Sequence, residues 1–574
     1  MSKLIGRIVA TEKKPTTMDE FNFWTNSDLK LNSFDIIKVK HIDNSYSFGV
    51  IKNISHLTDA QSFLTSFISN DFGDINIEVP TLRISMNCVE ATVIYNDKNI
   101  YTPVHNDAPV YLASAEEVTV ALGLKNVLNP LVCGKINMYE GSEDEFPIKV
   151  NLNAKFLLGP EGAHLNISGI SGLAAKTSYA MFLIKSAQEH FMREKEESVA
   201  YVILNVKGKD LMAIHEPNDF NEDSENTPEE IRKKTVAEYK AIGLTGKPFD
   251  NVKYYIPYTA QNSNKTSTYL SKCDIEEYKN QGILKKFKYT YEDDRESIEM
   301  LFADIDDPQQ TMESIISKIV DSKDSDFEGV TDWQEFLDKV SELASVQKKD
   351  EKTGKKSIRI SNEISVLSWR KFKRIINKAI KNDEMFANRT EESKGECRLA
   401  DAVKDITAND IMVIDVAKLS EDKQAFVFGD TLRTIYNLKL GEYDDELENH
   451  EIPDRIVIFI DELNKYASKD TPKNSPILRE LLDVTERGRS LGVVLFGAEQ
   501  FRSNIHARVT GNCSTHAYGR TNNIETGTND YKSLPTTYKN MLTRLKQGEY
   551  LIQNPIFRSL LKITFPKPIY KQFK

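Results

Sequence analysis

Disulfide patterns and zinc-binding patterns are missing from this sequence. Its five cysteines stand singly, and no two of them form a CxxC pair. This spacing indicates neither a zinc site nor a disulfide framework. The N-terminal stretch MSKLIGRIVATEKK has no long apolar core of the kind that a secretory signal carries. We therefore expect a reducing, cytoplasmic location.

Long apolar runs and an excess of basic residues are also missing. The apolar runs are far shorter than the roughly 18 residues that a membrane span needs, so we expect no membrane anchor. With 86 acidic and 75 basic residues, the net charge is −11. A protein that coats DNA with its outer surface should be basic. Any contact with nucleic acid must therefore come from a local basic patch, such as the lining of a channel.

What the sequence does contain is a change of pattern near residue 145. Before it, short alternating runs at 6–9, 35–39 and 48–51 predict a small β-barrel. After it, near-continuous apolar runs are typical of strands buried on both faces of a sheet. These runs lie at 199–206, 411–416, 456–460 and 493–496. Helical stretches fall between several of them, which predicts an α/β core with a mainly parallel sheet.

Residues 216–405 interrupt this alternation. They open with a polar acidic stretch, continue with a strand-like run at 252–258, and then show amphipathic helical patterns at 312–320 and 333–343. We interpret them as a mainly helical insertion. The predicted organisation is an N-terminal β-barrel at 1–145, the first part of the core at 146–215, the insertion at 216–405, and the second part of the core with a C-terminal β segment at 406–574.

A phosphate-binding loop is predicted at residues 169–177 (GISGLAAKT). A strand with Leu165 and Ile167 precedes it, and a helix with apolar residues on one face follows it, which is the context that such a loop needs. Its backbone N–H groups and the helix N-terminus would bind phosphate oxygens. Lys176 would neutralise the phosphates, and Thr177 would ligate Mg²⁺. The candidate nucleotide-binding residues are Gly169, Ser171, Gly172, Leu173, Ala174, Ala175, Lys176, Thr177 and Ser178.

The loop departs from the usual GxxxxGK[ST] pattern at one position. Ala175 stands where the second glycine is expected. Alanine penalises a positive φ angle, so this position would have to be helical for the loop to form without cost. A change in nucleotide affinity is the expected consequence.

A pair of acids ends another buried-type strand. In the run RIVIFIDE, Asp461 and Glu462 follow five apolar residues. Carboxylates at the carboxyl edge of a parallel strand face the ligand crevice. Asp461 would order Mg²⁺, and Glu462 would act as the general base that activates water. Together the loop and this strand predict an enzyme that binds and hydrolyses ATP.

Three further polar residues belong to the candidate catalytic set. Gln500 follows the apolar run at 493–496 and could sense the γ-phosphate or position water. Arg487 or Arg489 could reach the phosphates of a neighbouring subunit as an arginine finger. Solvated surface charge or an ion pair is the alternative for both arginines.

The order of these motifs resembles that of HerA-type ATPases, relatives of the FtsK translocases. The resemblance covers nearly the whole chain. It is carried by the barrel runs at 4–9 and 35–39, the phosphate loop region at 164–177, the turn at 205–209, the acid-tipped strand at 455–462, the segment at 487–500, the strand at 511–520 with Asn512 and Arg520, and the tail at 547–566. Asn205 is a second departure, since an acid is more usual there.

This resemblance implies a RecA-like P-loop core, a homo-hexameric ring with ATP between subunits, and DNA passing through a central pore. It also implies work with a nuclease or an NADase-type effector, in DNA processing or anti-phage defence. A ring would need basic residues only along its pore, and Lys207, Lys209 and the loop at 465–473 are candidates. Phosphate contacts from such lysines would carry no sequence information.

Two other functions stay open at the sequence level. The chain could be a ring-shaped scaffold that binds ATP and regulates a partner effector without moving along DNA. It could also be a secretion or conjugation ATPase of the same superfamily, although the lack of a membrane span disfavours the anchored type.

Overall fold

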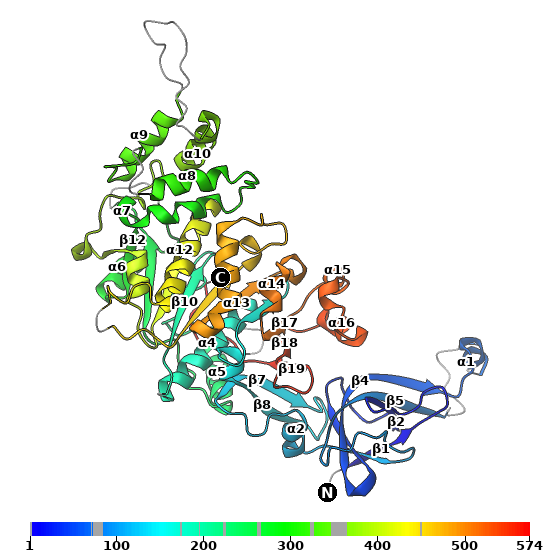
Figure 1. Ribbon diagram of the computed structural model, residues 1–574. Helices are drawn as coiled ribbons and strands as arrows, with labels where there is room; N and C mark the ends of the chain where they lie inside the picture. Colours follow the sequence, from blue (N-terminus) through cyan, green and yellow to red (C-terminus); the bar gives the residue numbers. More distant parts are fainter. Residues whose placement is uncertain are drawn as a thin grey trace, which may run out of the picture. The chain divides into compact units, whose positions relative to one another are not determined.

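The computed structural model confirms the predicted fold class: a RecA-like α/β P-loop core, a small N-terminal barrel and a set of helices (Figure 1). It describes residues 3–69, 72, 84–172, 175–194, 196–221, 226–260, 266–321, 326–345, 364–447 and 450–573. The chain forms two compact units. One comprises Met1–Asn153 with Ala517–Phe565, and the other comprises Ala154–His516 with Pro566–Lys574.

The first unit contains a closed antiparallel barrel with the strand order β1-β2-β5-β4-β3-β6. Successive side chains of a strand point to opposite faces, and in β2 Phe21 and Phe23 are buried while Trp24 is exposed. This alternation fills the barrel with apolar groups, and closure leaves no free strand edge. The strands are β1 Leu4–Val9, β2 Glu20–Thr25, β3 Ile36–Lys40, β4 Tyr46–Thr58, β5 Ser85–Asn96 and β6 Pro109–Leu112.

The remaining strands of this unit pair around the predicted C-terminal β segment. Strand β7 (Pro130–Met138) is antiparallel to β8 (Phe146–Asn153) and to β19 (Leu561–Thr564), which also pairs with β18 (Glu549–Gln553). The helices of the unit are short: α1 Phe63–Ser69, α2 Ala115–Ala121, α15 Asn523–Thr526, α16 Thr536–Leu542, η1 Ile42–Asn44 and η7 Asn529–Tyr531. The chain thus leaves the barrel at Leu112, and β7 belongs to a different sheet although it begins within the range 1–145.

The second unit is built on a parallel sheet with the order β13-β12-β11-β14-β10-β15-β16-β9. Strands β10, β15 and β16 are buried at every position, as a sheet covered by helices on both faces requires. The predicted strands are confirmed. The bounds are β9 Leu165–Ser168, β10 Val199–Asn205, β11 Val252–Pro257, β12 Leu284–Lys288, β13 Glu396–Arg398, β14 Ile411–Asp415, β15 Arg455–Asp461 and β16 Val493–Glu499, and β17 (Thr515–Tyr518) follows them.

Helices connect these strands, and several lie within residues 216–405. Helices α8 and α9 match the two predicted amphipathic patterns, while β11, β12 and β13 add three strands of the sheet to the same range. No described helix is long and apolar enough to cross a membrane. The helices are α3 Ala154–Leu157, α4 Lys176–Arg193, α5 Pro228–Ala241, α6 Lys272–Asn280, α7 Tyr291–Asp294, α8 Thr311–Val320, α9 Trp333–Leu343, α10 Val366–Ala379, α11 Leu399–Lys404, α12 Glu421–Leu440, α13 Pro476–Leu491 and α14 Ala507–Gly511, with η3 Arg295–Phe302, η4 Glu392–Lys394, η5 Leu463–Lys465 and η6 Arg502–Asn504.

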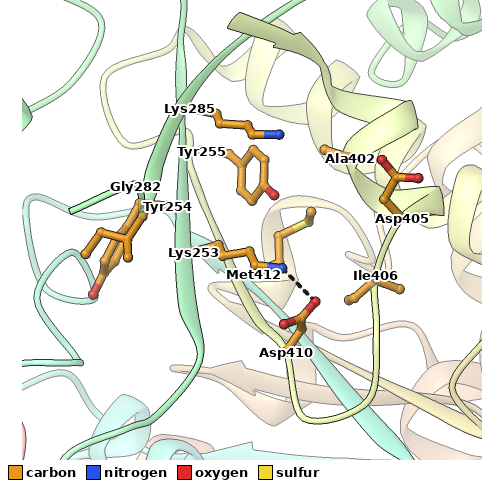
Figure 2. Close-up of a pocket in the computed structure, with 11 residues that line it drawn as sticks. Lys253, Tyr254, Tyr255, Gly282, Lys285, Ala402, Asp405, Ile406, Asp410 and Met412 are labelled. Atoms are coloured by element: carbon orange, nitrogen blue, oxygen red, sulfur yellow. Dashed lines mark hydrogen bonds and ion pairs between the residues drawn. The ribbon is translucent and has the colours of Figure 1, made fainter. Parts of the chain in front are cut away.

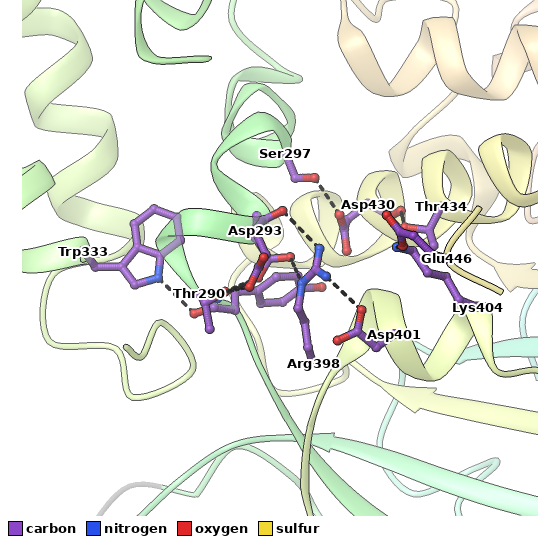
Figure 3. Close-up of polar contacts among 12 residues, drawn as sticks. Thr290, Asp293, Ser297, Trp333, Arg398, Asp401, Lys404, Asp430, Thr434 and Glu446 are labelled. Atoms are coloured by element: carbon purple, nitrogen blue, oxygen red, sulfur yellow. Dashed lines mark hydrogen bonds and ion pairs between the residues drawn. The ribbon is translucent and has the colours of Figure 1, made fainter. Parts of the chain in front are cut away.

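A buried polar network ties the helical segment to the sheet (Figure 3). Arg398, at the end of β13, donates from Nε to Asp294 Oδ1 at 2.7 Å, and the Thr290 backbone N–H donates to the other oxygen at 2.6 Å. Ser297 donates to the buried Asp430 of α12 at 2.6 Å. Burial raises the pKa of Asp294 to about 7, although Arg398 lowers it. Whether the Asp294 carboxyl group is charged near neutral pH therefore depends on the presence of Arg398.

Replacing Arg398 with methionine should destabilise this unit, because it leaves the Asp294 carboxyl buried without its cation. We expect a loss of about 3 kcal/mol in the free energy of unfolding at pH 8. The folded-state pKa of Asp294 already lies above its unfolded value and would rise further. The loss should therefore be smaller at pH 6, where Asp294 is protonated in the folded state.

Denaturant unfolding at the two pH values measures this effect. The control is Arg508→Met, which removes an exposed ion pair with Glu486 and should leave the unfolding midpoint almost unchanged. Equal effects of the two substitutions would contradict the assigned role of Arg398.

Candidate functional site

The predicted phosphate loop lies where the sequence places it, between β9 and α4. All four residues of β9 are buried, and the Gly169 backbone N–H donates to the Glu499 carbonyl of β16 at 3.1 Å. Gly169 and Gly172 have φ angles of 152° and 79°, which favour glycine. The loop therefore leaves the carboxyl edge of the sheet and enters the N-terminus of α4, where free backbone N–H groups attract anions. Leu173 and Ala174 lie outside the described residues.

Ala175 takes a conformation that favours glycine. As N-cap of α4 it has φ 49° and ψ 41°, the left-handed region, and not the helical conformation that would have avoided strain. For a residue with a Cβ atom this costs about 1 kcal/mol. The departure from the usual motif thus places a residue with a Cβ atom at a left-handed position and stores strain beside Lys176.

Lys176 is buried, with 5% of its surface exposed. Its Nζ donates to the Gly169 carbonyl at 2.9 Å and to Ser171 Oγ at 3.3 Å. Burial lowers the pKa of Lys176, while Asp461 and Glu462 raise it. The loop thus wraps around a cation that is held for an anionic ligand.

The loop and the acid-tipped strand meet at one contact. Thr177 Oγ1 donates to Asp461 Oδ2 at 3.0 Å, although 284 positions separate them in the chain. Strand β16 lies between β9 and β15, and all three run parallel, so their carboxyl ends reach the same edge. A hydroxyl beside a carboxylate supplies two of the oxygen ligands that Mg²⁺ prefers. The residues present therefore fit Mg²⁺ and a triphosphate.

Mg²⁺ at this position would also need oxygens from outside the protein. Among the described residues no cluster of three or more His, Cys, Asp or Glu side chains could hold a metal. Nucleotide-dependent Mg²⁺ sites use one or two protein ligands, with phosphate oxygens and water as the rest. The pair Thr177 and Asp461 is of this kind.

Glu462 is the second acid of the site, and it is held by two partners. It is buried, and its backbone adopts the left-handed conformation with φ 60°. Lys207 donates to its Oε1, as does Gln500 Nε2 at 3.1 Å. Burial alone would raise the pKa of Glu462, but the hydrogen bonds from Lys207 and Gln500 lower it below the usual value. Glu462 is therefore a charged acceptor at neutral pH.

Lys207, a predicted candidate for a pore lining, has partners in the nucleotide site. It follows β10 and contacts both acids, with its Nζ 3.8 Å from Asp461 Oδ2. Lys209 also has partners within the chain, since it lies 3.3 Å from Asp274 and over the ring of Phe573. Lys207 was identifiable in principle, because β10 and β15 are neighbours and a lysine just past one strand can reach acids just past the other.

Glu499 is a second residue of the site that sequence reasoning missed. It ends β16 and is fully buried. Burial raises the pKa of Glu499 to about 8, against the lowering effects of Arg502, Asn166 and Lys176. At neutral pH it is mostly protonated, so it adds little negative charge beneath a loop that receives phosphates.

Three other predicted residues have partners outside this cluster. Arg487 and Arg489 are on α13, where Arg487 lies 3.8 Å from Asp483 and Arg489 donates to the Glu161 carbonyl at 3.5 Å. No contact between either arginine and the Lys176 cluster occurs within the described part of the chain. Ser178 accepts a hydrogen bond from Gln572 at 3.3 Å, a contact with the C-terminal tail that no sequence pattern signals.

Comparison with known proteins gives only remote likenesses. No protein-family model and no curated protein matches the sequence. The bacterial conjugative coupling protein TrwBdeltaN70 aligns over 74% of this chain and 90% of its own, at 12% identity and a TM-score of 0.38. A plasmid coupling protein TrwB in complex with ADP and Mg²⁺ aligns over 71% and 78%, at 11% identity and a TM-score of 0.28. The genome packaging NTPase B204 from Sulfolobus turreted icosahedral virus 2, in complex with ATP-gammaS, aligns over 29% and 71%, at 15% identity and a TM-score of 0.22.

The strain at Ala175 can be tested by changing its side chain. Ala175→Gly removes the Cβ atom and should bind a Mg²⁺-nucleotide at least as tightly as wild type. Ala175→Val places a β-branched residue at positive φ, and we expect binding weaker by about tenfold or more, since a strain of over 1.4 kcal/mol has this effect. Nucleotide titration calorimetry measures both. Tighter binding by the valine variant than by the glycine variant would contradict the assigned conformation.

Proposed function

We propose that this chain is a cytoplasmic P-loop ATPase of the HerA/FtsK class. It forms a homo-hexameric ring and couples ATP hydrolysis to the movement of DNA through a central pore. It works with a nuclease or an NADase-type effector in DNA processing or anti-phage defence. The observation that carries the ATPase part is the contact between Thr177 and Asp461, which joins the Lys176 loop to the Glu462 strand.

Each residue of the cluster has a distinct task in this proposal. Lys176 neutralises the β- and γ-phosphates, and Thr177 with Asp461 holds Mg²⁺, which balances charge on the phosphate oxygens when bound. Glu462 accepts a proton from the attacking water. Gln500 orients Glu462 or that water, because it already donates to the same carboxylate oxygen.

Lys207 controls the availability of Glu462. While Lys207 occupies Oε1 of Glu462, that oxygen cannot accept a proton from water as readily. Movement of Lys207 would release the base, and this lysine is 43% exposed and hence able to move. The pairing is thus compatible with an active ATPase in which Lys207 and the attacking water share Glu462 in turn.

A ring with a central pore explains how a chain with an excess of acidic residues could bind DNA. With a net charge of −11, only a limited surface can attract phosphate groups. Since Lys207 and Lys209 have partners elsewhere, the loop at 465–473 remains the proposed pore lining. Arg487 and Arg489 remain candidates for contact with a neighbouring subunit, and Arg487 is 73% exposed.

One observation also supports the scaffold alternative. Glu462 is paired with Lys207 and Gln500, and a stable pairing would leave ATP bound but not hydrolysed. In that case ATP would arrange a partner effector, and DNA would not change ATP turnover.

An ATPase assay with and without duplex DNA separates these functions. We expect DNA to stimulate wild-type turnover, and Glu462→Gln to lower kcat by roughly 10²-fold or more, since general-base catalysis contributes that much. The matched control is Glu486→Gln, an exposed acid on α13 that pairs with Arg508, which should keep full activity. Turnover that is insensitive to DNA would favour the scaffold, and full activity of Glu462→Gln would overturn the assigned base. Particle mass in the same samples tests the hexamer.

The pH dependence of turnover tests the role of Lys207. Lys207 lowers the pKa of Glu462, and a base must be deprotonated to act. In Lys207→Met the pKa of Glu462 should rise, so activity should begin to fall at a higher pH when the solution is acidified. A pH–rate profile of both proteins shows the shift, and an unchanged acidic limb would contradict it.

A further inference from the structure

The parallel sheet has a second position where its connections diverge. Neighbouring strands β11 and β14 run parallel. The chain passes from β11 to β12 on one side, whereas it passes from β14 through α12 to β15 on the other side. Because such crossovers are right-handed, the two connections cover opposite faces of the sheet. Ligands of α/β sheets bind outside the carboxyl ends of strands at divergent points of this kind.

A cavity of about 510 Å³ lies at this position, within the range of small-molecule sites. It is lined by residues just past β11 and β14, by the end of α10 with the segment after it, and by the start of α12. We call it the lysine cavity, and its charged lining residues are Lys378, Lys381, Lys418, Lys423, Asp383 and Glu384.

The lysines of the lining outnumber the acids beside them. Lys423 pairs with Asp383, and Lys378 pairs with Asp422 beside the cavity. Lys418 makes no ion pair with any described carboxylate; it donates to the Thr266 hydroxyl at 2.5 Å and lies 4.9 Å from the centre of the Tyr269 ring. Lys381 has no ion pair or hydrogen bond with any residue that the structure describes. Lys381 and Lys418 thus stand against one lining acid without a lysine partner, Glu384, which leaves an excess of positive charge for an anion.

Hydroxyl groups complete the lining. Ser420, the N-cap of α12, makes no side-chain capping bond, so its hydroxyl is available to a ligand. Glu421 and Asp422 occupy the first turn of α12, so the attraction for an anion comes from the lysines rather than from the helix N-terminus. Glu384 accepts a hydrogen bond from the Ala260 backbone N–H at 2.6 Å and is thereby held at the rim.

A cavity at the opposite, amino edge of the same strands provides a contrast (Figure 2). It measures about 260 Å³, and its lining lysines, Lys253 and Lys285, are matched by Asp405 and Asp410. Lys253 lies 2.9 Å from Asp410. Equal numbers of acids and bases give that cavity no preference for an anion.

We propose that the lysine cavity binds a small phosphate-bearing ligand, at a site separate from the loop at 169–177. Four strand spacings lie between β14 and β9 in the sheet order, which places the two sites roughly 19 Å apart. Lysine supplies a point charge for phosphate oxygens, and a hydroxyl adds a hydrogen bond. The site adds a second phosphate-binding function to the same edge of the sheet as the proposed ATP site.

The test is a titration of inorganic pyrophosphate into the full chain, with the loop first saturated by a non-hydrolysable ATP analogue and Mg²⁺. We expect one further binding event in the wild type. In Lys381→Glu/Lys418→Glu it should weaken by at least about tenfold, since hydrogen bonds to charged groups are lost. The matched control Lys240→Glu/Lys285→Glu makes the same change of charge at exposed lysines outside the cavity and should bind as wild type.

Several outcomes would overturn the proposal. No binding to the saturated wild type, or the same affinity in both double variants, would do so. If the wild type binds no pyrophosphate while the cavity variant loses affinity for a short DNA duplex, the lysines contact a nucleic-acid backbone instead. Affinity for the ATP analogue should be unchanged in the cavity variant, so failure of this proposal is distinguishable from failure of the proposed ATP site. Should the charge reversal fail to fold, Lys381→Gln/Lys418→Gln provides the same comparison.

Discussion

The hydrogen bond between Thr177 and Asp461 is the contact on which the functional interpretation depends. It forms only because β9 and β15 run parallel on either side of β16, so that the loop after one and the acid after the other reach the same edge. All seven residues of β15 and of β16 are buried, so both strands lie inside the sheet with both faces covered. The site is thus a consequence of how the apolar strands pack.

Charge at this edge is balanced in a specific way. Lys176 is buried against the carbonyl of Gly169, Lys207 contacts both acids, and Glu499 is held mostly neutral beneath them by burial. A triphosphate with Mg²⁺ would replace contacts that the residues now make with each other. Ala175 enters α4 in the left-handed conformation, which costs strain beside Lys176.

Much of the fold was predictable because its signals are local. The strands around Val202, Ile458 and Leu495 are continuous apolar runs, and α9 follows a clear helical period. The pairing of strands was not predictable, because β12 and β13 are short and only partly apolar, and their place beside β11 is set by tertiary packing. The buried network of Arg398 and Asp294 likewise joins residues 104 positions apart.

The residues of the candidate site also differ in how far they could be predicted from local sequence patterns. Lys176, Thr177, Asp461 and Glu462 were identifiable because each follows a strand in a recognisable pattern. Lys207 was assigned to a pore because a lone lysine past a strand has no distinguishing pattern, and its partner lies 255 positions away. The αL conformation at Ala175 was missed because the sequence shows the residue and not its φ angle.

The central claim is that Thr177 and Asp461 serve one Mg²⁺ ion. A double-mutant cycle with Thr177→Val, Asp461→Asn and the combined variant tests it, with the Mg²⁺ dependence of nucleotide binding as the readout. Residues that share one ligand are energetically coupled. The double variant should therefore bind no more weakly than the worse single variant. Its loss of binding free energy should fall short of the sum of the two single losses by about 1 kcal/mol or more. Losses that simply add would show that the two residues act apart and would contradict the account.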